Sequence, residues 1–224
     1  MNQPPVRGMV KIDIDQSWTE MYPEAEEIIP YDLLEPLGKE CSVTCYVDAD
    51  HARDKVTCRS VTGILLLVNN TPLIWYTKRQ KTVESSTYGS ELVAARIGVE
   101  MVMEVRYKIR MLGMRLEGTS LMVGDNMSVV LNTTIPSSML KKKHNAVAYH
   151  RVREAVASKI INFSHLPSIS NVADVLTKPL NSEVFYGLMK EYMFRQPKTH
   201  LKTNLFEYQK KQSNYSNFII WFYY

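Results

Sequence analysis

Four acidic residues lie where a folded chain could gather them into one site: Asp48, Glu91, Asp125 and Asp174. Asp48 lies near the end of one β-prone segment and Asp125 ends another, so both are expected at carboxyl ends of strands. In open sheets, ligands bind outside the carboxyl ends of the strands. Glu91 and Asp174 are expected in the first turns of two helices, whose starts could close on the same point.

Carboxylates that crowd together repel one another unless a cation neutralises them. Mg²⁺ prefers hard oxygen ligands and keeps several waters, so an acidic cluster open on one side suits it. Two such ions about 3.5–4 Å apart can stabilise the attacking and leaving oxygens of a phosphodiester displacement. The four acids are therefore candidate ligands for two Mg²⁺ ions, with Mn²⁺ as the alternative.

Each acid also has a purely structural explanation. A first-turn acid such as Glu91 or Asp174 interacts favourably with the helix dipole, and an acid after a strand, such as Asp125, often caps the next helix. Spacing alone therefore leaves both interpretations open.

Other catalytic patterns are weaker. The segment YVDAD (46–50) resembles the Tyr-x-Asp-Asp turn of reverse transcriptases, but its acids are not adjacent, and Asp50 is interpreted as a surface or substrate-side residue. The chain contains no G-x-S-x-G elbow and no glycine-rich phosphate loop.

The elements that must position the acids follow the order β-β-β-α-β-α-β-α. The expected strands are 42–50, 62–70, 72–77, 120–125 and 160–166, with an Asn-Asn-Thr-Pro turn (69–72) joining the second and third. Helices are expected from near Ser86 to Gly113, from Asn126, from the 141–144 loop to about Ser158, and from near Asn171. This order predicts an α/β fold, a mixed five-stranded sheet with helices on both faces.

Composition is that of a globular chain, with 45% hydrophobic and 22% charged residues. The net charge of +4 permits an anionic partner but does not require one. Cys41, Cys45 and Cys58 form no finger-like pattern, so the first two are expected as buried thiols. An odd cysteine count without a secretory signal favours an intracellular setting, in a cytoplasmic particle or the nucleus. No apolar run reaches the roughly 20 residues of a membrane span, so no membrane partner is expected.

Three regions are expected along the chain. Residues 1–40 are rich in Pro, Glu and Asp and are interpreted as a linker or connection segment. The α/β domain covers 41–180, and a C-terminal helix and tail cover 181–224. The end of the tail, FIIWFYY, is β-prone and uncharged, which marks it as a possible adhesive segment.

Five stretches, in this order, resemble the ribonuclease H domain of copia-type LTR retrotransposon polyproteins. They are YVDADHARD (46–54), RSVTGILLLVNNTPLIWYTKRQKTVESSTYGSELVAA (59–95), GDNMSVV (124–130), KKKHNAVAYHRVREAV (141–156) and ADVLTKPL (173–180). The resemblance implies a ribonuclease H-like fold and places the family's four metal-binding carboxylates on Asp48, Glu91, Asp125 and Asp174.

The resemblance further implies hydrolysis of the RNA strand of an RNA–DNA hybrid during reverse transcription, leaving 5′-phosphate and 3′-hydroxyl ends. The partners would be the hybrid and the reverse transcriptase domain of the same polyprotein. Basic residues near the acids are candidates to bind hybrid phosphates: Lys78, Arg79, Lys81, Lys141, Lys142, Lys143 and His144. A solvated loop is the competing interpretation of the lysine run.

One departure from the pattern concerns histidine. Cellular relatives carry a histidine on the loop before the last aspartate, whereas this loop (167–172) has none, and His165 just before it is a possible substitute. A catalytically silent module that binds hybrid or supports the polymerase therefore remains the alternative function.

Overall fold

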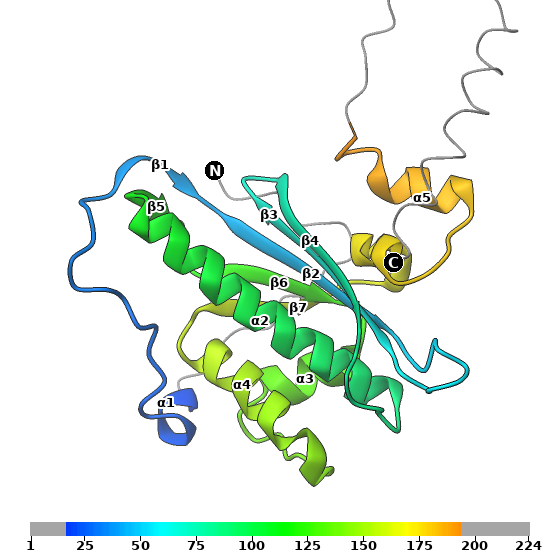
Figure 1. Ribbon diagram of the computed structural model, residues 1–224. Coiled ribbons are helices and arrows are strands. Elements are labelled where there is room, and N and C mark those ends of the chain that lie inside the picture. Colours follow the sequence, from blue (N-terminus) through cyan, green and yellow to red (C-terminus); the bar gives the residue numbers. More distant parts are fainter. Residues whose placement is uncertain (1–16, 194–224) are drawn as a thin grey trace, which may run out of the picture. The chain divides into compact units, whose positions relative to one another are not determined.

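The computed structural model describes residues 17–193 and places a mixed five-stranded sheet at the centre (Figure 1). The strands are β2 (Val43–Asp50), β3 (Val61–Val68), β4 (Thr71–Arg79), β6 (Ser120–Gly124) and β7 (Ile161–His165). Their order is β4-β3-β2-β6-β7; β2, β3 and β4 are antiparallel neighbours, while β6 and β7 continue parallel to β2. This confirms the mixed sheet and the parallel pairing of the strand that carries Asp48 with the strand that leads to Asp125.

The predicted hairpin joins β3 and β4. Asn69 and Asn70 both adopt the left-handed conformation, with φ of 50° and 64°. Two consecutive left-handed residues suit a two-residue hairpin turn, and asparagine tolerates this region better than most residues. Pro72 follows on the edge strand, where its missing N–H leaves no central ladder bond unmade.

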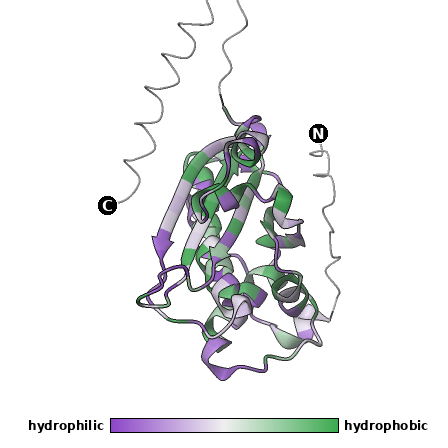
Figure 2. Cartoon of the chain, turned by 90° about the vertical axis from the view of Figure 1, so that its right-hand side faces the viewer, coloured by the Kyte–Doolittle hydropathy of each residue, from purple (hydrophilic) through white to green (hydrophobic). Residues whose placement is uncertain are grey.

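Helices cover both faces of the sheet, as expected. One face packs against α2 (Thr87–Met111) and α4 (Ala146–Ala157), with α3 (Met127–Thr134) beside them. The opposite face packs against the 3₁₀ helix η3 (Val172–Leu176) and the end of α5 (Ser182–Met189). Along β2, Cys45 and Val47 belong to the first core and Tyr46 to the second, as the two-residue period of a strand requires. Figure 2 shows hydrophobic (green) and hydrophilic (purple) segments in the sheet and in the helices around it.

The ends of α2 are those that the sequence predicts. The Ser86 side chain accepts a hydrogen bond from the Gly89 amide at the start, and Gly113, with φ of 68°, follows the last turn.

The last predicted helix differs from expectation. The chain after β7 forms two short 3₁₀ helices, η2 (Ser168–Ser170) and η3, and no α-helix begins until Ser182. Pro179 disfavours helical geometry at Lys178, and the Thr177 side chain bonds to Asp48 on the sheet. A tight turn held against the sheet therefore replaces the expected α-helix near Asn171.

The described part of the expected linker lies along the domain. It contains α1 (Trp18–Met21) and β1 (Leu37–Cys41), and β1 pairs in parallel with β5 (Met114–Leu116) in a second, two-stranded sheet. The sequence did not predict this sheet. Cys41 and Cys45 are buried, as expected, and Cys58 is exposed. Among residues 17–193, no helix has the length and apolar character needed to cross a membrane. The FIIWFYY segment lies outside the described residues.

Arg153 on α4 fixes the start of the described chain. Its side chain is 1% exposed and lies over the rings of Trp18 and Tyr149, with its guanidinium carbon 4.6 and 5.0 Å from the ring centroids. The guanidinium also donates to the carbonyl oxygens of Asn132, Ile135 and Pro136 at the end of α3, at 2.7–3.0 Å. Carbonyl dipoles and ring faces therefore stabilise this buried charge.

Glu27 attaches the N-terminal segment to α2. Its carboxylate accepts hydrogen bonds from the guanidinium groups of Arg106 and Arg110 on α2, including contacts of 2.7 Å from each. Burial alone would raise the pKa of Glu27, but the two guanidinium groups lower it to about 2 from an ordinary value of 4.5.

We expect Glu27→Gln to lower the free energy of unfolding at pH 7 by about 2 kcal/mol, because two arginines lose their anionic partner. Since the pKa of Glu27 is depressed in the folded chain, its contribution is present above pH 4.5 and disappears as pH falls toward 2. Urea unfolding from pH 7 to pH 3 measures this. The matched control is Glu26→Gln, at an exposed neighbour. Equal stability of the two variants at pH 7 would refute the attachment.

Candidate metal centre

Asp48, Asp125 and Asp174 come together at the carboxyl ends of two central strands. Each offers a carboxylate oxygen, and the three oxygens lie within 4.8 Å of one another. The register of the sheet explains the first two: Tyr46 on β2 pairs in parallel with Val123 on β6. Two residues further along both strands, Asp48 and Asp125 reach the same edge.

Asp174 reaches the site because Asn171 ties η3 to the sheet. The Asn171 side-chain amide donates to the Val47 carbonyl oxygen at 2.9 Å, and its side-chain oxygen accepts from the Ala173 amide at 3.2 Å. The first contact fixes the turn against β2 and the second starts η3. The sequence therefore places Asp174 beside Asp48 through a buried asparagine three residues earlier.

Gly63 on β3 makes room for this turn. It pairs with Asp48 across the sheet, and a Cβ atom at Gly63 would lie 2.5 Å from Thr177 Cγ2 and 3.0 Å from the Ala173 carbonyl oxygen. A larger residue would push η3 away from the sheet. The close approach lets the Thr177 hydroxyl donate a hydrogen bond to Asp48 Oδ2.

Glu91 lies on α2, near enough to Asp48 and Asp125 to interact with their charges. It is buried in the first turns of α2 and falls outside the group whose oxygens lie within 4.8 Å. Burial raises the pKa of Glu91 well above its ordinary value, and the charges of Asp48 and Asp125 raise it further. Glu91 is thus an electrostatic neighbour of the cluster.

The charges of the cluster act on one another. Burial raises the pKa of Asp48 to about 6; the Thr177 hydrogen bond and Lys178 oppose the rise, while Asp174 and Asp125 add to it. For Lys178, burial acts to lower the pKa, but the carboxylates of Asp48 and Asp174 raise it above its ordinary value.

Lys178 and Thr177 are the residues at the site that sequence reasoning missed. The Lys178 ammonium lies 3.0 Å from Asp174 Oδ1 and 3.3 Å from Asp48 Oδ1. The sequence feature that could have revealed Lys178 was its position four residues after Asp174, a spacing at which side chains on a helical turn meet.

The donor set fits a hard divalent cation. Three carboxylates offer oxygen atoms within reach of one ion, and one of them, Asp125, is only partly buried, so waters could complete the coordination. Asp48, Asp125 and Asp174 would hold such an ion, with Glu91 adding negative charge from α2.

The predicted basic residues lie in two places, at the end of β4 and in the segment 141–144. Lys142 donates to the hydroxyls of Ser85 and Ser86 at the start of α2, at 3.3 and 3.0 Å. His144 lies 3.6 Å from the Glu84 carboxylate. Lys141 and Lys143 are exposed.

At the end of β4, Lys78 and Lys81 are exposed and Arg79 pairs with Asp54 at 2.6 Å. His165 lies with its Nε2 3.0 Å from the Asp125 carbonyl oxygen, which places it next to the cluster.

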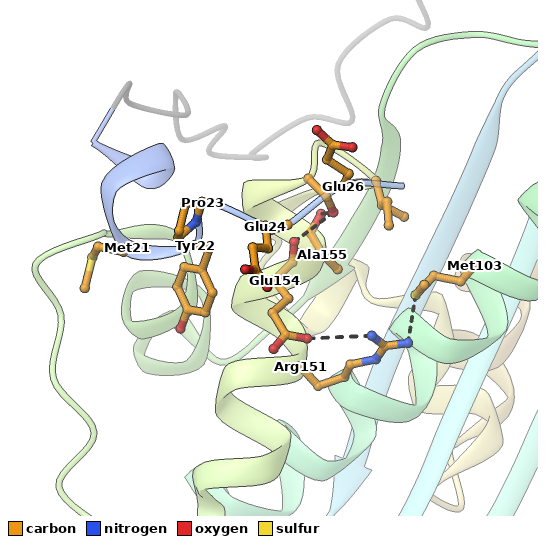
Figure 3. A pocket seen from close by; sticks show the side chains of 12 residues that line it. Met21, Tyr22, Pro23, Glu24, Glu26, Met103, Arg151, Glu154 and Ala155 are labelled. Atoms are coloured by element: carbon orange, nitrogen blue, oxygen red, sulfur yellow. Dashed lines mark hydrogen bonds and ion pairs between the residues drawn. The ribbon is translucent and has the colours of Figure 1, made fainter. Parts of the chain in front are cut away.

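A pocket of about 450 Å³ lies elsewhere, between residues 21–26 and helices α2 and α4 (Figure 3). Its wall includes Arg151, which contacts Glu154 at 3.7 Å and the Met103 sulfur at 3.2 Å. None of the four acids lines this pocket.

Comparisons with known proteins find relatives of one kind, including three retrovirus-related Pol polyproteins from plant transposons. The chain is 32% identical over 149 residues to the retrovirus-related Pol polyprotein from transposon RE1 of Arabidopsis thaliana, which covers 66% of this chain and 10% of that protein. It is 27% identical over 154 residues to the Pol polyprotein from transposon RE2 of the same plant, and the match covers 69% of this chain and 11% of that protein. It is 31% identical over 142 residues to that of transposon TNT 1-94 of Nicotiana tabacum (63% and 10%). These relatives confirm the predicted resemblance to retrotransposon polyproteins, of which this chain spans about a tenth.

No family model matches the chain. Among solved structures, it is similar to an N-terminal RNase H domain from Mycobacterium tuberculosis, at 15% identity and a TM-score of 0.48, covering 67% of this chain and 98% of that one. It is also similar to RNase H1 from Halobacterium salinarum, at 14% identity and a TM-score of 0.47, covering 61% and 94%.

Proposed function

We propose that this chain is a metal-dependent ribonuclease H, which hydrolyses the RNA strand of RNA–DNA hybrids within a retrotransposon polyprotein. The observation that carries the proposal is the meeting of Asp48, Asp125 and Asp174 at one sheet edge, with Glu91 in electrostatic contact with two of them. Separate structural roles for each acid would not require them to share one point. The similarity to Pol polyproteins supports the same assignment.

The acidic residues and Thr177 have different roles at the site. Asp48, Asp125 and Asp174 would bind and orient two Mg²⁺ ions, or Mn²⁺ in their place, and Glu91 would add negative charge from α2. When bound, such ions lower the pKa of water and stabilise the charge on attacking and leaving oxygens. Thr177 holds one oxygen of Asp48, which limits rotation of that carboxylate.

Exposed lysines would hold the backbone of the hybrid. The loop with Lys141 and Lys143 lies next to the start of α2, since Lys142 contacts Ser86, and Glu91 lies five residues further along that helix. Lys78 and Lys81 offer further charge at the end of β4. Phosphate contacts carry no base preference, so cleavage is expected on hybrids of any sequence.

We expect Lys141→Ala with Lys143→Ala to weaken hybrid binding and to make the slope of log affinity against log salt shallower by about 0.7–0.9 per lost contact. Lys142 is left in place because it also holds the start of α2. Fluorescence anisotropy over a salt series measures the slope. Lys108→Ala is the control, since Lys108 lies at the opposite end of α2. A slope equal to that of the parent would identify the run as a solvated loop.

A silent module is the second candidate, and one observation favours it: an ammonium already lies among the acids, so the cluster could be neutralised without metal. The two functions differ in a direct assay. The purified chain is incubated with a labelled RNA–DNA hybrid, single-stranded RNA and duplex DNA, each with Mg²⁺ or with EDTA. We expect cleavage of the RNA strand of the hybrid in Mg²⁺ and no cleavage in EDTA. No cleavage with either Mg²⁺ or Mn²⁺ would favour the silent module.

A further inference from the structure

Lys178 makes contacts that an ordinary surface lysine does not make. A lysine four residues after an aspartate forms a local ion pair with small effect. Lys178 forms that pair with Asp174 but also reaches Asp48, which lies 130 positions away in sequence and whose side chain is 0% exposed. Its own side chain remains 32% exposed. The Lys178 side chain therefore reaches a buried carboxylate while remaining partly exposed.

The oxygens of the two aspartates are occupied in this arrangement. Lys178 lies next to Oδ1 of both Asp48 and Asp174. The second oxygen of Asp48 accepts from Thr177, and that of Asp174 accepts from Ser168 at 3.3 Å. A divalent ion bound to both Oδ1 atoms would lie about 2.1 Å from each. An ammonium about 3 Å from the same two oxygen atoms would lie close to this ion, and the two positive charges would repel each other strongly.

We propose that Lys178 is an internal counter-ion of the carboxylate cluster, which neutralises part of its charge in the metal-free chain and is displaced when a divalent cation binds. The inference rests on the proposed function, because it takes the three aspartates to be the cation site. With three ionised aspartates, Lys178 reduces the excess charge from three to two. The lysine therefore stabilises the metal-free chain and weakens cation binding by the same interaction.

Variants of Lys178 separate charge from packing. Lys178→Met keeps the apolar stem and removes the charge, Lys178→Arg keeps the charge, and Lys190→Met removes an exposed lysine elsewhere. We expect Lys178→Met to melt at a lower temperature in EDTA and to bind Mn²⁺ at least about tenfold more tightly by calorimetry. Lys178→Arg and Lys190→Met should bind within about threefold of the parent.

The outcomes separate this inference from the proposed function. If the parent binds Mn²⁺ and Lys178→Met binds it equally or more weakly, the counter-ion role is wrong while the metal site stands. If the parent and all variants fail to bind Mn²⁺, the metal site is wrong and the inference falls with it.

A measurement on the parent chain avoids any folding defect of the variants. Amine acetylation followed by mass spectrometry reports how accessible each lysine is. We expect Lys178 to react slowly in EDTA and several-fold faster with saturating Mn²⁺, while Lys190 reacts alike in both. Unchanged or slower reaction of Lys178 with Mn²⁺ would show that the cation does not displace it.

Discussion

Asp48→Asn should reduce cleavage of the RNA strand by about a thousandfold or more. Asp48 is the most buried of the three aspartates and lies on the central strand of the sheet, which pairs with β6 and is bonded to Asn171 at the start of η3. Loss of its charge would remove a ligand from the proposed ions, which would supply several kcal/mol of transition-state stabilisation. Single-turnover cleavage of a labelled hybrid at saturating Mg²⁺ measures the loss.

The same variant should keep its fold. Asparagine has nearly the same shape, its side-chain oxygen can still accept from Thr177, and a buried charge is removed. Its melting temperature in EDTA should lie within a few degrees of the parent value. Glu104→Gln is the control, because it removes one carboxylate from the exposed side of α2. An active Asp48→Asn variant would exclude Asp48 from the site.

Arg153→Met should lower the free energy of unfolding by about 3–5 kcal/mol. Methionine replaces the stem, but the carbonyl oxygens of Asn132, Ile135 and Pro136 lose their donor and the ring of Trp18 loses its cation. Each buried acceptor left unsatisfied costs about 1–3 kcal/mol. Urea unfolding followed by circular dichroism gives the difference.

Arg151→Met provides the comparison on the same helix. Arg151 is partly exposed and its ion pair with Glu154 spans 3.7 Å, so its replacement should change stability by no more than about 0.5 kcal/mol. Similar losses for both variants would mean that Arg153 does not hold α3 and the N-terminal segment together.

The parts of the fold predicted correctly are those specified by local pattern. The Asn69-Asn70 turn fixes the β3–β4 hairpin because few residue pairs accept two left-handed conformations. The alternation along β2 and the period of α2 identify the faces that pack together. The parallel register that brings Asp48 to Asp125 then follows from the order of strands and helices.

The contacts that sequence reasoning missed join residues far apart in the chain. Lys178 contacts Asp48 and Glu27 contacts Arg106, and neither pair has a fixed spacing that could reveal it. The turn at 168–176 escaped prediction for a related reason. Its backbone is held by Asn171 and Thr177 bonding to β2, a tertiary constraint that overrides local helix propensity.

The most direct test of the proposed metal site is to locate Mn²⁺ through its anomalous scattering in crystals of the chain. At this site the carboxylates would hold the ions for phosphodiester cleavage. We expect two peaks about 3.5–4 Å apart. Carboxylate oxygens of Asp48, Asp125 and Asp174 should surround them at about 2.0–2.2 Å, with the Lys178 ammonium moved away. Mn²⁺ bound elsewhere, with Lys178 still between Asp48 and Asp174, would contradict the proposed metal site.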